Sequence, residues 1–254
     1  GEDHSTPTYG KVFIAVKPAV GSVISDVRKT ALIASLDNRN VLSIDPEIID
    51  AEFLYVIPSV IVNYNPSKTT LSAGAIESGV HTTAAAFQTE NLNSFGKIFR
   101  FSKFSTEIDN SDTSILSNET TLQLQKRFTP VVGISTKYEI KYNNAILNNG
   151  VAGDITSTSF TYSGFTCTLR DDATGNIDVV RASGSTFVVV AEQIGSVDYA
   201  AGIVTINSFN PSAVDNSGVI HLNVTPAFPD IVPVREQILQ LAQTSVNTVE
   251  DREE

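Results

Sequence analysis

The feature that most constrains the fold is a series of short strand candidates between residues 131 and 228. Apolar and polar side chains alternate along each candidate. The stretches between them, such as "DDATGN" and "DNSG", are rich in Gly, Asn, Asp and Ser. Short strands separated by turn residues at regular intervals are typical of an antiparallel sandwich or barrel. We therefore predict an antiparallel β domain over residues 131–228.

The region before it, residues 1–130, mixes two periodicities. The stretch "YGKVFIAVKP" (9–18) alternates as a strand does, whereas residues 22–36 have helical spacing. A β-branched and aromatic stretch at 51–65 is followed by a helical pattern over about 70–95, and the region closes on "ETTLQLQKRF". The order β-α-β-α-β predicts an α/β sandwich, in which one sheet is covered by two helices.

The last segment, residues 229–254, opens near "VPVREQILQL" and ends in "VEDREE". Asp230 can cap a helix, and Pro233 fits a first helical turn. Apolar residues follow at spacings close to a helical repeat, which predicts a C-terminal amphipathic helix with an acidic tail. The fold class is thus α+β, with the helix after the two domains. The candidate interface is this stripe, which docks either on the chain's own α/β domain or on a neighbouring subunit: Val234, Ile238, Leu241 and Val246.

Bulk composition excludes several classes of partner. The 254-residue chain is 41% hydrophobic and 18% charged, which describes a folded protein. Its net charge of −11 repels phosphate backbones, so we predict no nucleic-acid partner. The longest apolar runs, such as residues 55–62, are too short to span a bilayer, and the polar start is no signal peptide, so no membrane partner is expected. The chain lacks Met even at position 1, which suggests a piece of a longer protein or a processed product.

Motifs that carry chemistry are weak. Glu77 and His81 lie one helical turn apart, but two ligands do not make a metal site, and a solvated ion pair is the better interpretation. Cys167, the single cysteine, excludes an internal disulfide and is expected to be a buried, inert thiol. The loop that starts at Asp172 fails as a calcium loop and predicts a turn with Gly175 at positive φ. We predict no catalytic residue, no cofactor and no metal, and hence no enzyme.

Three stretches of the first region carry a resemblance to a known family. They are "GKVFIAVKP" (10–18), "EFLYVIPSVIVNYNP" (52–66) and "LNSFGKIFRFSKF" (92–104), in this order around two helical patterns. In these stretches the chain resembles the baseplate wedge proteins of contractile-tailed bacteriophages, the baseplate J-like family. The stretch "GSVDYAAGIVTINSF" (195–209) is similar to wedge proteins of the T4-like phages.

The resemblance implies a structural virion protein of the tail baseplate, assembled in the host cytoplasm. Such proteins self-associate as homodimers, contact other baseplate wedge proteins, join wedges into a ring around the central hub, and rearrange when the sheath contracts. The alternative is a carbohydrate- or receptor-binding β-module. Aromatic side chains in or beside the strand candidates motivate it, namely Tyr138, Tyr142, Tyr162 and Tyr199.

Overall fold

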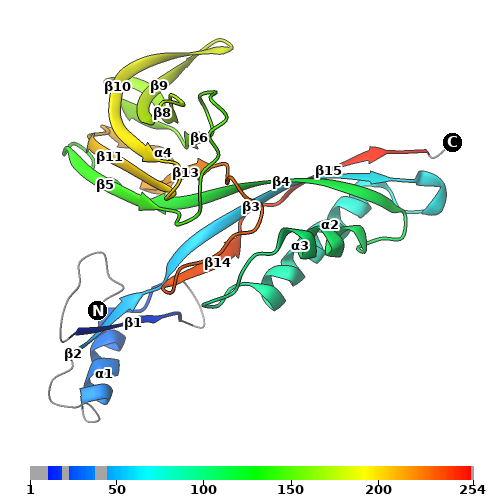
Figure 1. Ribbon diagram of the computed structural model, residues 1–254, viewed down its shortest axis with the longest axis horizontal. Helices are drawn as coiled ribbons and strands as arrows, with labels where there is room; N and C mark the ends of the chain where they lie inside the picture. The colour runs from blue at the N-terminus through cyan, green and yellow to red at the C-terminus, as the bar shows by residue number, and fades with distance from the viewer. Residues whose placement is uncertain (1–10, 19–22, 38–44, 253–254) are drawn as a thin grey trace.

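The computed structural model describes residues 11–18, 23–37 and 45–252. Within them, a small N-terminal unit leads into a long sheet with two helices on one face, and that sheet continues into a curled β domain (Figure 1). The molecule is elongated, with the N-terminal unit at one end and the strand β15 (Ser245–Glu250) at the other (Figure 1).

The N-terminal unit consists of β1 (Lys11–Val16), α1 (Asp26–Asp37) and β2 (Asp45–Asp50). The two strands are parallel and form a sheet of their own, in which Lys11 is opposite Asp45. This arrangement corrects the prediction of one sheet for residues 1–130. The sequence pattern did not separate β2 from the strand that follows, so β1 was expected to pair within the larger sheet.

The central layer is built on β3 (Glu52–Tyr64) and β4 (Ile115–Phe128), which pair antiparallel over most of their length. A short 3-10 helix, η1 (Pro66–Lys68), leads from β3 toward α2 (Ala73–Asn91), and α3 (Phe101–Asp109) precedes β4. Both helices lie on the same side of the long strands (Figure 1). The apolar side of α2 is buried as its spacing predicts, through Ile76, Val80, Ala84 and Phe87. Ser72 caps α2, because its side chain accepts a hydrogen bond from the amide of Ala75.

The β domain is an extension of the same sheet. Its strands are β5 (Thr136–Lys141), β6 (Ile155–Ser157), β7 (Phe160–Tyr162), β8 (Phe165–Asp171), β9 (Asn176–Ser183), β10 (Thr186–Asp198), β11 (Ile203–Phe209), β12 (Ala213–Val214) and β13 (Ile220–Val224). A short helical turn, α4 (Asp215–Gly218), precedes β13. The pairing order β4-β13-β6-β8-β9-β10-β11-β5 is antiparallel throughout, as the turn-rich sequence predicts.

Strand β4 belongs to both parts of the molecule. Its residues Ile115–Gln125 pair with β3, and its last residues, Leu124–Phe128, pair with β13. One cluster of buried side chains therefore runs from Phe87 and Phe99 under the helices to Phe160 and Phe209 in the β domain. This continuity couples the two parts mechanically.

The prediction of a C-terminal helix is wrong. The chain forms β14 (Gln237–Leu241) and β15 (Ser245–Glu250), and both strands pair in parallel with β3. The reason lies partly in β3. Without β14 and β15, the backbone N–H and C=O groups along its outer edge would have no partner. Strand β14 pairs with Glu52–Val56 and β15 with Ser59–Tyr64.

Pro58 lies at the point where β3 exchanges one parallel partner for the next. Proline has no amide to donate, so a break in the ladder at this residue leaves no donor unpaired. The C-terminal segment makes its own break nearby, where Gln243 has φ of 41°. Val and Thr side chains in β15 favour a strand, and the apolar spacing that resembles a helix spans two separate strands.

Candidate interaction surfaces

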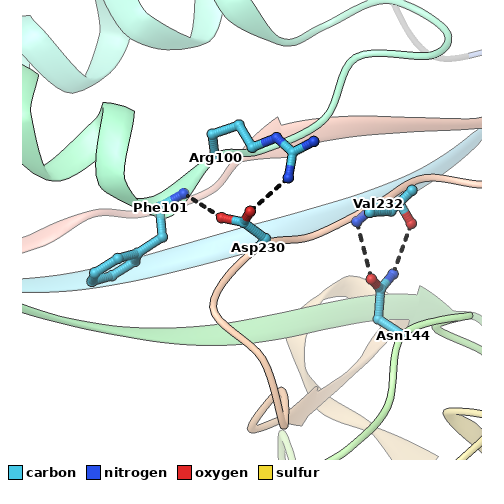
Figure 2. A network of polar contacts seen from close by, with 5 residues as sticks. All are labelled: Arg100, Phe101, Asn144, Asp230 and Val232. Carbon is cyan, nitrogen blue, oxygen red and sulfur yellow. Dashed lines mark hydrogen bonds and ion pairs between the residues drawn. The ribbon is translucent and has the colours of Figure 1, made fainter.

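The segment between β13 and β14 fastens the β domain to the helices. Ile231 and Phe99 exchange both backbone hydrogen bonds, each at 3.0 Å. One residue earlier, the Asp230 carboxylate accepts from the Phe101 amide at 2.9 Å and from the Arg100 guanidinium at 2.7 Å (Figure 2). Phe101 is the first residue of α3, and Arg100 makes no side-chain cap of its own. Asp230 thus caps a helix that is distant in sequence.

A second fastening lies two residues further along. The Asn144 side chain accepts from the amide of Val232 and donates to its carbonyl, each at 3.0 Å (Figure 2). Asn144 follows β5 and therefore belongs to the β domain. Asp230 and Asn144 together hold one short segment against α3 on one side and the β domain on the other. We refer to this arrangement of Asp230, Val232, Asn144 and Arg100 as the clamp.

Charge stabilises the Asp230 half of the clamp. The hydrogen bond from Arg100 lowers the pKa of Asp230 below its usual range, and the Phe101 amide lowers it further. A carboxylate at the start of a helix also interacts favourably with the helix dipole. Both residues are substantially exposed, so the ion pair itself contributes little, and the cap is the larger effect.

The structure places the four predicted interface residues in different surroundings. Ile238 is fully buried in β14, where it forms an isolated bridge with Phe95. Leu241 and Val246 are half-buried and pack against the core from β14 and β15. Val234 is half-buried and lies before β14. The four do not form the single helical stripe that the spacing predicts. Leu241 and Val246 pack against this chain's own core, and contact of the four residues with a neighbouring subunit stays a prediction.

The N-terminal unit exposes the apolar surface that a partner could cover. Val27 is 80% exposed and Val23 is 65% exposed, although both lie on or beside α1. None of the residues of this unit that the structure describes belongs to the main core cluster. A groove of about 770 Å³ lies between the end of β1 and α1, and another of about 560 Å³ lies between β1 and Phe95. Parallel sheets are normally covered on both faces, so these surfaces are unusually bare.

A second apolar surface lies on the hairpin of β9 and β10, which projects from the β domain (Figure 1). Three consecutive residues of β10 are exposed, Phe187, Val188 and Val189. Because side chains alternate along a strand, these residues present apolar surface on both faces of the hairpin. Arg170 stacks over the Phe187 ring at 4.3 Å. We call this hairpin the β9–β10 arm.

The weak chemical candidates have structural explanations. The Glu77 carboxylate accepts a hydrogen bond from Thr248 of β15 at 3.1 Å. Cys167 is buried, and burial raises the pKa of its thiol. Burial raises the pKa of Asp172, but hydrogen bonds from Thr174 and Asn176 outweigh it and hold that pKa well below the usual range.

The Asp172 loop is the predicted turn, with Gly175 at φ of 104°. Among the described residues, no group of three or more His, Cys, Asp or Glu side chains is placed to hold a metal ion. In the same residues, no helix has the length and apolarity needed to cross a membrane.

The comparisons with known proteins agree with the division of the chain into an N-terminal unit and a long sheet. Residues 52–127 match the family model described as baseplate structural protein gp6, C-terminal domain III, and residues 1–49 match the model for C-terminal domain I of the same protein. The boundary between the two matches falls between β2 and β3, where the structure passes from the N-terminal unit to the long sheet. The matched class is that of phage baseplate structural proteins.

A particular relative is the baseplate wedge protein gp6 of Enterobacteria phage T4. The chain is 29% identical to it over 149 residues, which is 57% of this chain and 21% of the T4 protein. The chain therefore spans about a fifth of the length of this curated relative.

Proposed function

We propose that this chain is a structural subunit of the baseplate of a contractile phage tail, without catalytic activity. It self-associates, contacts other baseplate wedge proteins, and links wedges into a ring around the central hub. Its location is the tail baseplate of the virion. The observation that carries the proposal is the pair of matches to gp6 domains, whose shared boundary coincides with a boundary in the structure. Membership of the baseplate J-like family is part of this proposal.

The exposed surfaces support an assembly role. The N-terminal unit and the β9–β10 arm carry apolar side chains that an isolated chain leaves in water. Contiguous apolar surface of this kind usually marks contacts with other proteins. The clamp ties the segment between β13 and β14 to α3 through Asp230 and to the β domain through Asn144. We infer that the N-terminal unit and the arm contact neighbouring subunits, and that the clamped body moves as one piece when the sheath contracts.

We give less weight to the alternative, a carbohydrate- or receptor-binding β-module, because the tyrosines that motivate it are buried or half-buried. Tyr142 is fully buried, and its hydroxyl donates to the Leu222 carbonyl at 2.7 Å. The other three tyrosines are half-buried and pack against the core: Tyr138, Tyr162 and Tyr199. Stacking on a sugar requires an exposed ring face. These rings are instead part of the protein's own packing.

Sedimentation equilibrium of the purified chain tests self-association. The proposal predicts a concentration-dependent mass that reaches at least a dimer at about 50 µM, because association follows mass action. Val27→Asp should shift the equilibrium toward monomer, since it places a charge on the exposed face of α1. The matched control is Ile61→Asp, at an exposed position on β3 outside that surface. A monomer at every concentration contradicts self-association.

A further inference from the structure

The β domain has an open seam between β4 and β5. The chain passes from β4 to β5 through residues 129–135, so the two strands are consecutive. Yet within the part of the chain that the structure describes, β5 pairs only with β11 and ends the strand order of the sheet. The last residues of β4 pair with β13 on one side, and pairing with β3 on the other side stops at Gln125. Among the described residues, these two strand edges therefore have no ladder partner at the seam.

Side chains fill only part of this seam. Near the connecting loop, the rings of Phe128 and Tyr138 lie 5.2 Å apart, and the Tyr138 hydroxyl accepts from the Val131 amide at 2.8 Å. Away from the loop, a groove of about 480 Å³ remains open. Its lining is made of short stretches from β3, β4 and β5: Glu52, Phe53, Lys126, Arg127, Phe128, Glu139, Ile140 and Lys141.

The lining of the groove carries a small net positive charge in a protein that is acidic. Its lining holds three cations and two carboxylates, whereas the whole chain has a net charge of −11. Each carboxylate is already paired, Glu52 with Lys126 at 2.8 Å and Glu139 with Lys141 at 2.9 Å. Arg127 makes contacts with neutral groups instead, the Gln125 side-chain oxygen at 2.8 Å and the Tyr55 ring at 3.7 Å. A guanidinium has five N–H donors, so Arg127 can bind a further carboxylate.

The side chains of β5 alternate in a way that suits an added strand. Ile140 is buried on the inner face, whereas Lys137 and Glu139 are exposed on the outer face. A strand added to this edge would place apolar residues beside Ile140 and polar residues beside the charges of β5. Charged side chains also protect an open edge from indiscriminate pairing. The same charges admit a strand of complementary charge, which gives the edge selectivity.

We propose that the seam between β4 and β5 is a docking slot for an extended, acidic segment of a partner polypeptide. The segment adds to β5 as a strand, alternates apolar and acidic residues, and places a carboxylate against Arg127. Main-chain hydrogen bonds supply affinity and the basic lining supplies selectivity, as in other cases of strand addition. This inference names the kind of partner that the proposed baseplate subunit would bind. Its evidence is the geometry and charge of the seam, which do not depend on the baseplate proposal.

The direct test is fluorescence anisotropy with the full chain and a labelled eight-residue peptide of alternating Val and Asp. We expect saturable binding at low salt that weakens as salt screens the charges. An alternating Val and Lys peptide should not bind. A Val and Asp peptide with N-methylated backbone amides keeps its charge but lacks donors, and it should bind at least about tenfold more weakly, a loss of roughly 1.4 kcal/mol. Equal binding of the N-methylated peptide would refute strand addition.

Paired variants locate the site. Arg127→Glu with Lys141→Glu should weaken the acidic peptide at least about tenfold. Lys97→Glu with Lys103→Glu makes the same change in charge at two exposed residues outside the groove, and it should change binding less than about twofold. The single variant Arg127→Gln serves as a second test should the double variant fail to fold.

Equal effects of the two double variants, or the absence of saturable binding to the wild-type chain, would overturn the slot. These results leave self-association untouched. A monomeric chain that still binds the peptide would instead contradict self-association alone.

Discussion

At the scale of single residues, Asp230 shows how one side chain joins parts that are distant in sequence. It lies 130 residues from Arg100 and supplies the cap that α3 lacks locally. Its capping ability is readable from the sequence, because Asp before a Pro-containing segment is a common cap. The sequence predicts that Asp230 caps a C-terminal helix, whereas it caps α3. Nothing in the local sequence indicates that residue 230 lies beside residue 101.

Replacing Asp230 should therefore weaken the junction. Asp230→Ala removes both the cap and the ion pair, and we expect the free energy of unfolding to fall by about 1–2 kcal/mol, close to the usual cost of a lost cap. Urea unfolding followed by circular dichroism measures the change. Glu107→Gln, at an exposed position on α3, is the matched control and should be nearly silent. An unchanged midpoint in Asp230→Ala would show that the cap is unimportant.

The same residue predicts a pH dependence. The pKa of Asp230 is lowered in the folded state, chiefly by Arg100, from an ordinary value near 3.8. A lowered pKa stabilises the fold above the unfolded pKa, and this stabilisation is lost as pH falls through the folded pKa. The difference in stability between wild type and Asp230→Asn should thus be largest near neutral pH and shrink below about pH 4. A difference that stays constant from neutral pH to acid would argue against the carboxylate.

Asn144 makes the other half of the clamp. Asn144→Ala loses two hydrogen bonds to the backbone of Val232, and we expect a loss of about 1–2 kcal/mol of stability. Because the Val232 amide then loses its acceptor, its hydrogen exchange should accelerate more than exchange in β3. Asn247→Ala, at an exposed position in the edge strand β15, is the control. Equal exchange at Val232 in both variants would contradict a role in fastening.

At the scale of elements, periodicity predicts the structures that local packing determines. α2 is long, and its apolar spacing corresponds to a buried side made of Ile76, Val80, Ala84 and Phe87, although Leu71 before the helix is exposed. The β domain is antiparallel because its turns force neighbouring strands to reverse, as Gly175 does between β8 and β9. The C-terminal helix fails because β14 and β15 depend on the edge of β3, which lies some 180 residues earlier. The spacing of apolar residues alone does not reveal that β3 has an open edge with which a distant segment can pair.

The interaction surfaces are harder to predict than the elements. Ile238 was expected on an interface and is buried at zero exposure. Phe187, Val188 and Val189 look like an ordinary buried strand in sequence and are exposed, because the hairpin extends past the body. Arg127 and Lys141 lie on consecutive strands, and the ends of β4 and β5 bring them into one groove. The exposure of these side chains depends on how the strands are arranged in the sheet, which the local sequence does not show.

Strand β14 should consequently be essential for folding. Ile238→Asp places a charge in a fully buried position, and we expect it to cost at least about 3 kcal/mol or to abolish folding. Val249→Asp makes the same change on β15, where the side chain is 47% exposed, and it should cost less than about 1 kcal/mol. Thermal unfolding distinguishes them. Equal melting temperatures would contradict the placement of β14 in the core.

At the scale of the whole molecule, one continuous sheet carries two bodies and leaves apolar surface at its extremities. β4 passes from the helical layer into the β domain, and the clamp fastens them a second time. The N-terminal unit is joined through Ala51 and through Lys17, whose ammonium donates to the Asn93 side chain at 2.7 Å. We infer that such a body transmits force along its length and that its exposed apolar ends bind neighbours. Both properties suit a subunit of a baseplate that changes shape.

The most direct test of the baseplate role is electron microscopy of phage particles in which residues 52–252 of this chain have been deleted. The proposal predicts that baseplates do not form, so that tails are absent and heads accumulate, and that supplying the intact chain restores complete tails. Contractile tails with complete baseplates in the deletion phage would contradict the account.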